Sequence, residues 1–225
     1  MSQKEKLFSR REILLMAGGL SGLVITGTLG SVFQQETQRH LTPHVEMGPF
    51  YPRMKPLDTD ADLTVFAGKT GRAQGKVVHL SGRVLNHRGE PVSGAKIEIW
   101  QANTHGRYAN VSDPNPAPLD PNFQGYGVQM TDNEGRYRFK TIKPGAYPTG
   151  PNTMRPPHIH FEISGKANQL TTQMFFPGEP LNEKDFLFQE LGKERDAALA
   201  KLLAPTKELE PDSIVAVFDI VLERG

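Results

Sequence analysis

The stretch Met-Arg-Pro-Pro-His-Ile-His-Phe-Glu-Ile, residues 154–163, decides how the rest of the chain is interpreted. His158 and His160 are separated by one residue and are followed by alternating apolar and polar residues, which is typical of a β-strand with both imidazoles on one face. The two prolines before His158 cannot donate to a β-ladder and suit the entry to a strand. This pattern predicts two potential metal ligands at the beginning of a strand. The alternative is an edge strand with two half-exposed histidines and no metal.

Alternating segments on both sides of this stretch predict an all-β fold. A single helix is predicted at about residues 183–203. Short strands separated by turns, with one peripheral C-terminal helix, are typical of a β-sandwich. The predicted organisation is an N-terminal segment (1–35), an irregular arm (36–76) and a β-sandwich domain (77–225). The strand-like segments are 77–84, 95–100, 127–131, 136–141, 158–164, 169–175 and 214–222.

The composition indicates an ordinary globular protein and excludes several functions. The 225 residues are 37% hydrophobic and 23% charged, which is the balance of a chain with a substantial core. No cysteine is present, so disulfides, thiolate metal sites and a cysteine nucleophile are excluded. Residues 1–35 hold four of the 26 basic and two of the 25 acidic residues, which leaves 22 basic and 23 acidic residues beyond them. Without a basic tract, nucleic acid is not expected as a partner.

The N-terminal segment resembles an export signal. Residues 13–35 carry no charge and follow Lys4, Lys6 and the pair Arg10-Arg11. Paired arginines before an apolar, glycine-rich run indicate a twin-arginine signal, so the domain is expected on the periplasmic or extracellular side. Because the run is long enough to span a bilayer, a membrane anchor is the alternative.

Two long connections, residues 102–126 and 143–157, interrupt the β pattern. Loops of this length in a compact domain are usually functional or disordered. The first carries Tyr108 two residues after Gly106, and the second carries Tyr147 two residues after Gly145. Together with His158 and His160 these tyrosines form a set of two oxygens and two nitrogens that suits a hard trivalent ion such as ferric iron. The alternatives are tyrosines that only pack over the sandwich, and a zinc or copper site at the histidines alone.

Around these residues the chain carries a series of motifs in uninterrupted order: 82–84, 98–103, 106–108, 117–123, 141–148, 155–161 and 218–222. With these motifs the sequence resembles the intradiol ring-cleavage dioxygenases, and most closely the β-subunit type of protocatechuate 3,4-dioxygenase. The resemblance implies a β-sandwich with long active-site loops. It also implies that a catechol and O2 react at a non-haem Fe(III) ion to give a muconate-type dicarboxylate.

Carried over by position, the resemblance implies a role for each of seven residues. Tyr108, Tyr147, His158 and His160 correspond to the iron ligands, and Tyr147 is also expected to accept a proton from the substrate. Arg155 and Gln173 correspond to catalytic, substrate-binding residues; the alternatives are an ion pair of Arg155 with a surface acid and a strand-edge cap by Gln173. Tyr51 is expected to line the substrate pocket, and plain packing is the alternative.

The sequence differs from the protocatechuate enzymes at two places, so both protocatechuate-like and catechol-like compounds remain candidate substrates. Thr149 stands where the protocatechuate enzymes carry a tryptophan, and the chain has its own segment Gly-Pro-Phe-Tyr at residues 48–51. A homo-oligomer is expected. The competing hypothesis is a non-catalytic, prealbumin-like sandwich that binds an aromatic ligand.

Overall fold

The structure of the protein is a computed structural model that describes residues 40–224. The predicted export segment, residues 1–35, lies outside the described residues. Within residues 40–224, no helix has both the length and the apolar character needed to cross a membrane.

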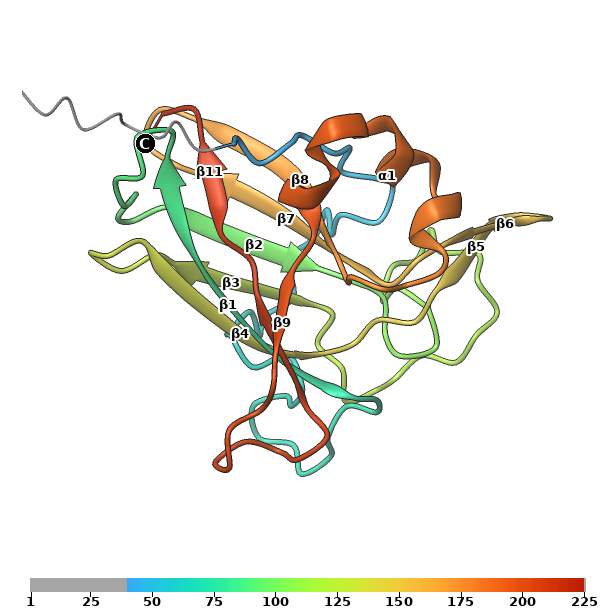
Figure 1. Cartoon of the computed structure of the whole chain (residues 1–225). Helices are drawn as coiled ribbons and strands as arrows, with labels where there is room; N and C mark the ends of the chain where they lie inside the picture. Colours follow the sequence, from blue (N-terminus) through green and yellow to red (C-terminus); the bar gives the residue numbers. More distant parts are fainter. Residues whose placement is uncertain (1–39, 225) are drawn as a thin grey trace, which may run out of the picture. The chain divides into compact units, whose positions relative to one another are not determined.

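The described residues form two main sheets and a small two-stranded sheet (Figure 1). In the first sheet, the central strand β1 (Val77–Asn86) pairs in parallel with β10 (Ile214–Val217) and β11 (Ile220–Leu222). On its other side β1 pairs in antiparallel with β4 (Arg136–Ile142), and β9 (Lys201–Leu203) pairs with β10 at the far edge. The second sheet has the order β3 (Tyr126–Met130), β2 (Lys96–Trp100), β7 (His158–Ser164), β8 (Gln169–Phe175). The third pairs β5 (Tyr147–Gly150) with β6 (Thr153–Arg155).

The main hydrophobic core gathers alternate residues of β1 and β7, which belong to different sheets. Val78, Leu80 and Val84 of β1 are buried with Ile159 and Phe161 of β7 in one cluster. Side chains of a strand alternate between its two faces. The histidines of β7 therefore lie on the opposite face from the main core, where a second cluster of aromatic side chains covers them. These features confirm the predicted all-β fold.

The single helix predicted at residues 183–203 is wrong in detail. The structure has a 3-10 turn (η2, Asn182–Lys184), the short helix α1 (Phe186–Glu190), a 3-10 segment (η3, Gly192–Ala198) and then β9. Asp185 separates the first two because its backbone is extended and its side chain accepts a hydrogen bond from the N–H of Phe188. The positive φ of 55° at Gly192 then interrupts the helical path.

The segment predicted as one strand at residues 214–222 is two strands, β10 and β11. The carbonyl of Phe218, between them, accepts a hydrogen bond from the Tyr137 hydroxyl instead of a strand partner. The carboxylate of Asp219 accepts the N–H of Arg83. The N–H of Phe218 still donates to the carbonyl of Ser81 at 2.9 Å, and pairing with β1 resumes in the same register at Val84 and Ile220.

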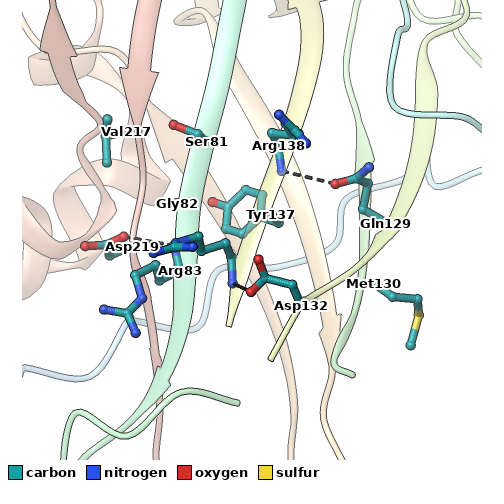
Figure 2. A pocket seen from close by; sticks show the side chains of 11 residues that line it. Ser81, Gly82, Arg83, Gln129, Met130, Asp132, Tyr137, Arg138, Val217 and Asp219 are labelled. Carbon is teal, nitrogen blue, oxygen red and sulfur yellow. Dashed lines mark hydrogen bonds between the residues drawn. The ribbon is translucent and has the colours of Figure 1, made fainter. Parts of the chain in front are cut away.

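Strand β4 lies at an edge of the first sheet, and charged side chains line the groove beside it (Figure 2). Gln129 accepts the N–H of Arg138 and Asp132 accepts the N–H of Arg136, so two edge donors are satisfied by side chains. Such charged and capped edges resist pairing with another chain. None of the residues predicted for the functional site lines this groove.

The arm before β1 contains no extended strand between residues 40 and 76, yet it is bonded to both sheets. The N–H of Thr42 donates to Val221 and that of Val45 donates to Thr171. Leu63 donates to Lys140 and is fully buried. These contacts bring residues 46–51 over the aromatic cluster that covers the histidines.

Candidate metal centre

His158 and His160 lie in β7, between β2 and β8, and their side chains are almost fully buried. Trp100, the register partner of His160 on β2, stacks on its imidazole with ring centroids 4.8 Å apart and planes 11° apart. Nδ1 of His158 is 2.7 Å from the carbonyl oxygen of Pro156 and donates its proton there. This hydrogen bond leaves the lone pair of His158 on Nε2, which is how metal-binding histidines are usually fixed.

The two loops that carry the tyrosines are pressed against each other. Gly106 has a φ of 76°, and a Cβ atom there would lie 2.3 Å from the carbonyl oxygen of Ala146. The N–H of Gly145 donates to Asn103 at 2.9 Å, and the carboxylate of Asp113 accepts the N–H of Tyr108 at 2.7 Å. Glycine is required at residue 106 because any side chain would separate the loops and move both phenol rings.

The four donor atoms of the predicted ligand set converge. Tyr108 Oη lies 3.0 Å from His160 Nε2, the two Nε2 atoms lie 3.2 Å apart, and Tyr147 Oη lies 3.4 Å from His158 Nε2. Adjacent ligands at about 2.0–2.2 Å from one shared ion are separated by about 2.8–3.6 Å, depending on the ligand–metal–ligand angle. The donor spacing therefore fits a single metal ion, with two hard oxygens and two imidazole nitrogens as ligands.

Burial keeps all four groups neutral unless a cation is present. It raises the pKa of the Tyr108 phenol well above its usual range, an effect that Tyr147 reinforces. It also raises the pKa of Tyr147, although the Arg155 guanidinium partly opposes this. Burial, followed by the Arg155 charge, holds the pKa values of His158 and His160 well below 6.5. A bound trivalent ion would compensate the cost of ionising the phenols.

Other residue types do not offer a competing metal site in the described part of the chain. Among residues 40–224 there is no group of three or more His, Asp or Glu side chains placed to hold a metal ion. A site there needs the two tyrosines, and phenolate oxygen favours a hard ion over copper(I) or structural zinc.

Arg155 is held rigidly beside this ligand set. Its Nε donates to Asp185 at 2.6 Å, and its Nη2 donates to the Gln173 amide oxygen at 2.8 Å. The amide nitrogen of Gln173 in turn donates to the carbonyl of Glu46 at 2.9 Å. Gln173 therefore lies behind Arg155, where it positions the guanidinium and ties down the N-terminal arm, and it does not line the adjoining cavity.

A cavity of about 770 Å³ opens beside the donor atoms. Tyr147, His160 and Arg155 line it, whereas Tyr108 and His158 lie behind them. The arm supplies part of the wall through Phe50, whose ring stacks on Tyr108 with centroids 4.5 Å apart. A ligand in this cavity reaches one tyrosine and one histidine of the set without displacing the other two.

The structure places Tyr51 outside the cavity, contrary to the prediction. Its hydroxyl donates to the Glu98 carboxylate at 3.0 Å, and its ring packs edge-on against Trp100 at 4.9 Å. Burial and the hydrogen bond to Glu98 raise the pKa of Tyr51 to about 12. Phe50 and Tyr51 lie at a turn and a bend of the arm, and there Phe50 lines the cavity while Tyr51 contacts Glu98 and Trp100 instead.

Three residues that serve the site were not predicted. Asp185 had a visible signal as a helix N-cap before an apolar run, but nothing in the sequence indicates its ion pair with Arg155. Phe50 and Trp100 lie within the motifs at residues 48–51 and 98–103, and only the three-dimensional structure shows that their rings cover Tyr108 and His160.

Comparisons with known proteins agree with this site. A family model described as Dioxygenase matches residues 47–224. A protocatechuate 3,4-dioxygenase beta chain from Burkholderia cepacia is 49% identical over 171 residues, which cover 74% of this chain and 72% of that protein. A hydroxyquinol 1,2-dioxygenase from Rhizobium sp. (strain MTP-10005) is 31% identical over 63% of this chain, but the match spans only 50% of that protein. The dioxygenase domain of a carbohydrate-binding protein fusion from Streptomyces sp. SirexAA-E has a TM-score of 0.63 and 28% identity, covering 83% of this chain and 100% of that chain.

The fold and the converging donor atoms define a class of β-sandwich proteins with a buried tyrosine–histidine donor set that can hold a metal ion. Within that class, the chain belongs to the Dioxygenase family, that is, to the intradiol ring-cleavage dioxygenases. This confirms the resemblance drawn from the motifs and favours an enzyme over the non-catalytic aromatic-binding sandwich.

Proposed function

We propose that Tyr108, Tyr147, His158 and His160 hold one ferric ion and that the adjoining cavity binds a catechol. The enzyme then cleaves the ring between its two hydroxylated carbons with O2, giving a muconate-type dicarboxylate. The observation that carries this proposal is the convergence of four donor atoms within 3.0–3.4 Å of their neighbours. Members of the family use non-haem Fe(III), and the donor set suits that ion.

When bound, ferric iron draws electron density from a coordinated catecholate and so makes a ring carbon reactive toward O2. Tyr147 is the phenol that lines the cavity, so its Oη is the one that a catechol hydroxyl can reach. Arg155 lowers the pKa of Tyr147 against the effect of burial and thereby favours the phenolate form. Tyr147 therefore accepts a proton from the incoming catechol. Tyr108 does not line the cavity and takes no proton from the catechol.

Arg155 supplies a fixed positive charge at the cavity wall. Asp185 and Gln173 hold its Nε and Nη2 atoms, so the guanidinium does not need to reorganise when a substrate binds. A preorganised cation stabilises negative charge that develops on a reacting ring most effectively in a site with little water. Gln173 contributes by orienting Arg155 and not by contact with the substrate.

The experiment is a comparison of two matched phenol deletions in iron-loaded protein. Tyr108→Phe should weaken iron binding and alter the visible tyrosinate-to-iron absorption band, because one phenolate oxygen is lost. Tyr137→Phe is the control, because Tyr137 is equally buried but donates to Phe218 far from the donor atoms. An unchanged band in Tyr108→Phe would remove that residue from the ligand set.

Oxygen uptake with catechols, together with mass analysis of the product, tests the reaction. An intradiol enzyme converts one catechol and one O2 to a dicarboxylate that contains both atoms of the O2 molecule. Ligand binding without oxygen uptake would instead support the aromatic-binding sandwich. A colourless or blue protein would support a zinc or copper site.

We further propose that residues 1–35 export the protein as a twin-arginine signal, cleaved or retained as a membrane tether, and that the exported protein is a homo-oligomer. The pair Arg10-Arg11 before an uncharged run supports the export route. Replacing both arginines by lysine should shift the protein from the periplasmic to the cytoplasmic fraction. An unchanged distribution would contradict the route, and light scattering of the purified protein measures the oligomer.

A further inference from the structure

The charges around the cavity restrict which catechols it accepts. Two carboxylate residues, Glu46 and Asp113, line the cavity, and Arg155 is the one cationic side chain among the described lining residues. The Arg155 charge is already paired, because Asp185 accepts hydrogen bonds from its Nε at 2.6 Å and its Nη2 at 3.3 Å. Both carboxylate oxygens of Asp113 accept backbone N–H groups, those of Tyr108 and Asn115. A substrate carboxylate would therefore find no uncompensated cation among the lining residues and would meet the like charge of Glu46.

The mouth of the cavity is instead suited to an uncharged group. Phe186, the first residue of α1, lines it and is 56% exposed. Pro49, Pro114 and Pro148 add further apolar surface to the same wall. Since a cavity of about 770 Å³ lies in the range that buries drug-sized ligands, it exceeds the needs of a single dihydroxylated ring. Phe186 and the three prolines offer apolar surface to a substituent on such a ring.

We infer that the substrate is a catechol whose ring carries an extended, uncharged substituent in place of a carboxylate. This inference rests on the proposed function, because the ring hydroxyls must lie at the Tyr147 and His160 side of the cavity. The substituent then points to the mouth and packs on Phe186, while Glu46 disfavours an anionic group in the cavity. Thr149, which also lines the mouth, leaves space that a larger side chain would fill.

The test uses two substrates that differ only in charge and length, 3,4-dihydroxybenzoate and its butyl ester, with unsubstituted catechol as the reference. In oxygen-uptake assays of the full-length, iron-loaded protein, kcat/KM for the ester should exceed that for the acid by about tenfold or more. Equal or higher kcat/KM for the acid, with catechol consumed, would overturn the inference and leave the proposed function intact. Failure to consume any of the three compounds would overturn both.

Two variants distinguish charge from packing. Glu46→Gln should raise kcat/KM for the acid relative to the ester, whereas the control Glu183→Gln, whose carboxylate lies outside the cavity, should keep the parent ratio. The methyl ester of 3,4-dihydroxybenzoate, which is uncharged but short, serves as a further substrate. Phe186→Ala should lower kcat/KM for the butyl ester more than for this methyl ester. If Glu46→Gln leaves the acid-to-ester ratio of kcat/KM unchanged and Phe186→Ala leaves the butyl-to-methyl ratio unchanged, then Glu46 and Phe186 do not select the substituent. The inference is then wrong.

Discussion

Replacement of Arg155 by leucine tests both the stability and the activity of the site. The Arg155 and Asp185 side chains are only 6% and 1% exposed, and their closest atoms are 2.6 Å apart. Removing one partner of a buried ion pair leaves an uncompensated charge and costs about 3–5 kcal/mol. Since small domains are stabilised by about 5–15 kcal/mol in total, Arg155→Leu should remain folded with a much reduced free energy of unfolding.

The double variant Arg155→Leu/Asp185→Asn separates the two effects. Asparagine is neutral and remains a good N-cap for α1, which begins after residue 185. The double variant should therefore recover about 2 kcal/mol or more of the lost free energy, because no isolated charge stays buried. Turnover should stay low in both variants, by about 10²–10³-fold, since the cation at the cavity wall is absent in both.

The chain contains a single tryptophan, so urea unfolding at fixed iron saturation can be followed through the fluorescence of Trp100. Oxygen uptake measures turnover in the same samples. If Arg155→Leu is as stable as the parent protein, the ion pair does not carry the energy assigned to it. If the double variant regains turnover, Arg155 acts only through stability.

Three further outcomes are expected. Tyr51→Phe should lower the free energy of unfolding by about 1–3 kcal/mol, because buried Glu98 loses a hydrogen-bond donor. Turnover should be unchanged; a large loss of turnover would instead show that Tyr51 acts on the substrate. Gly106→Ala should cost at least about 1–2 kcal/mol for its positive φ and weaken iron binding by separating the tyrosine loops; normal iron binding would show that the loops are independent. Hydrogen bonds from Arg72, His79 and Lys140 lower the pKa of Glu210 in the folded protein. The contribution of Glu210 to the free energy of unfolding is therefore fully present above its pKa in the unfolded chain, about 4.3. This contribution is lost as the pH falls through the lower pKa of the folded protein. Glu210→Gln should therefore cost about 0.2–1 kcal/mol near neutral pH, and a difference from the parent that does not shrink in acid would contradict this linkage.

Much of the site was accessible from the sequence because its chemistry is carried by residue types and local spacing. His158 and His160 share a face through the two-residue period of a strand, and the structure has this strand at residues 158–164. The two loop tyrosines were identified together with the histidines, and all four donor atoms meet in the structure. The iron itself and the export of the protein remain proposals.

The failures share a physical cause, which is that side-chain direction and long-range pairing are set by the folded chain. Tyr51 and Phe50 are neighbours with similar chemistry, and only the path of the arm over the sheet decides which of them faces the cavity. The predicted helix at residues 183–203 followed local propensity. It was overridden by the Asp185 side chain, which caps α1 and pairs with Arg155 30 residues earlier.

The sequence by itself determined the all-β class, the four donor residues and the family, since alternation of side chains and specific motifs are local properties of the chain. The tertiary structure decided which donors face the cavity, how Asp185 and Gln173 fix Arg155, and which charges line the cavity. These features arise where loops and strands distant in sequence pack together, and burial there sets the pKa values and the pairing of charges that no local pattern encodes.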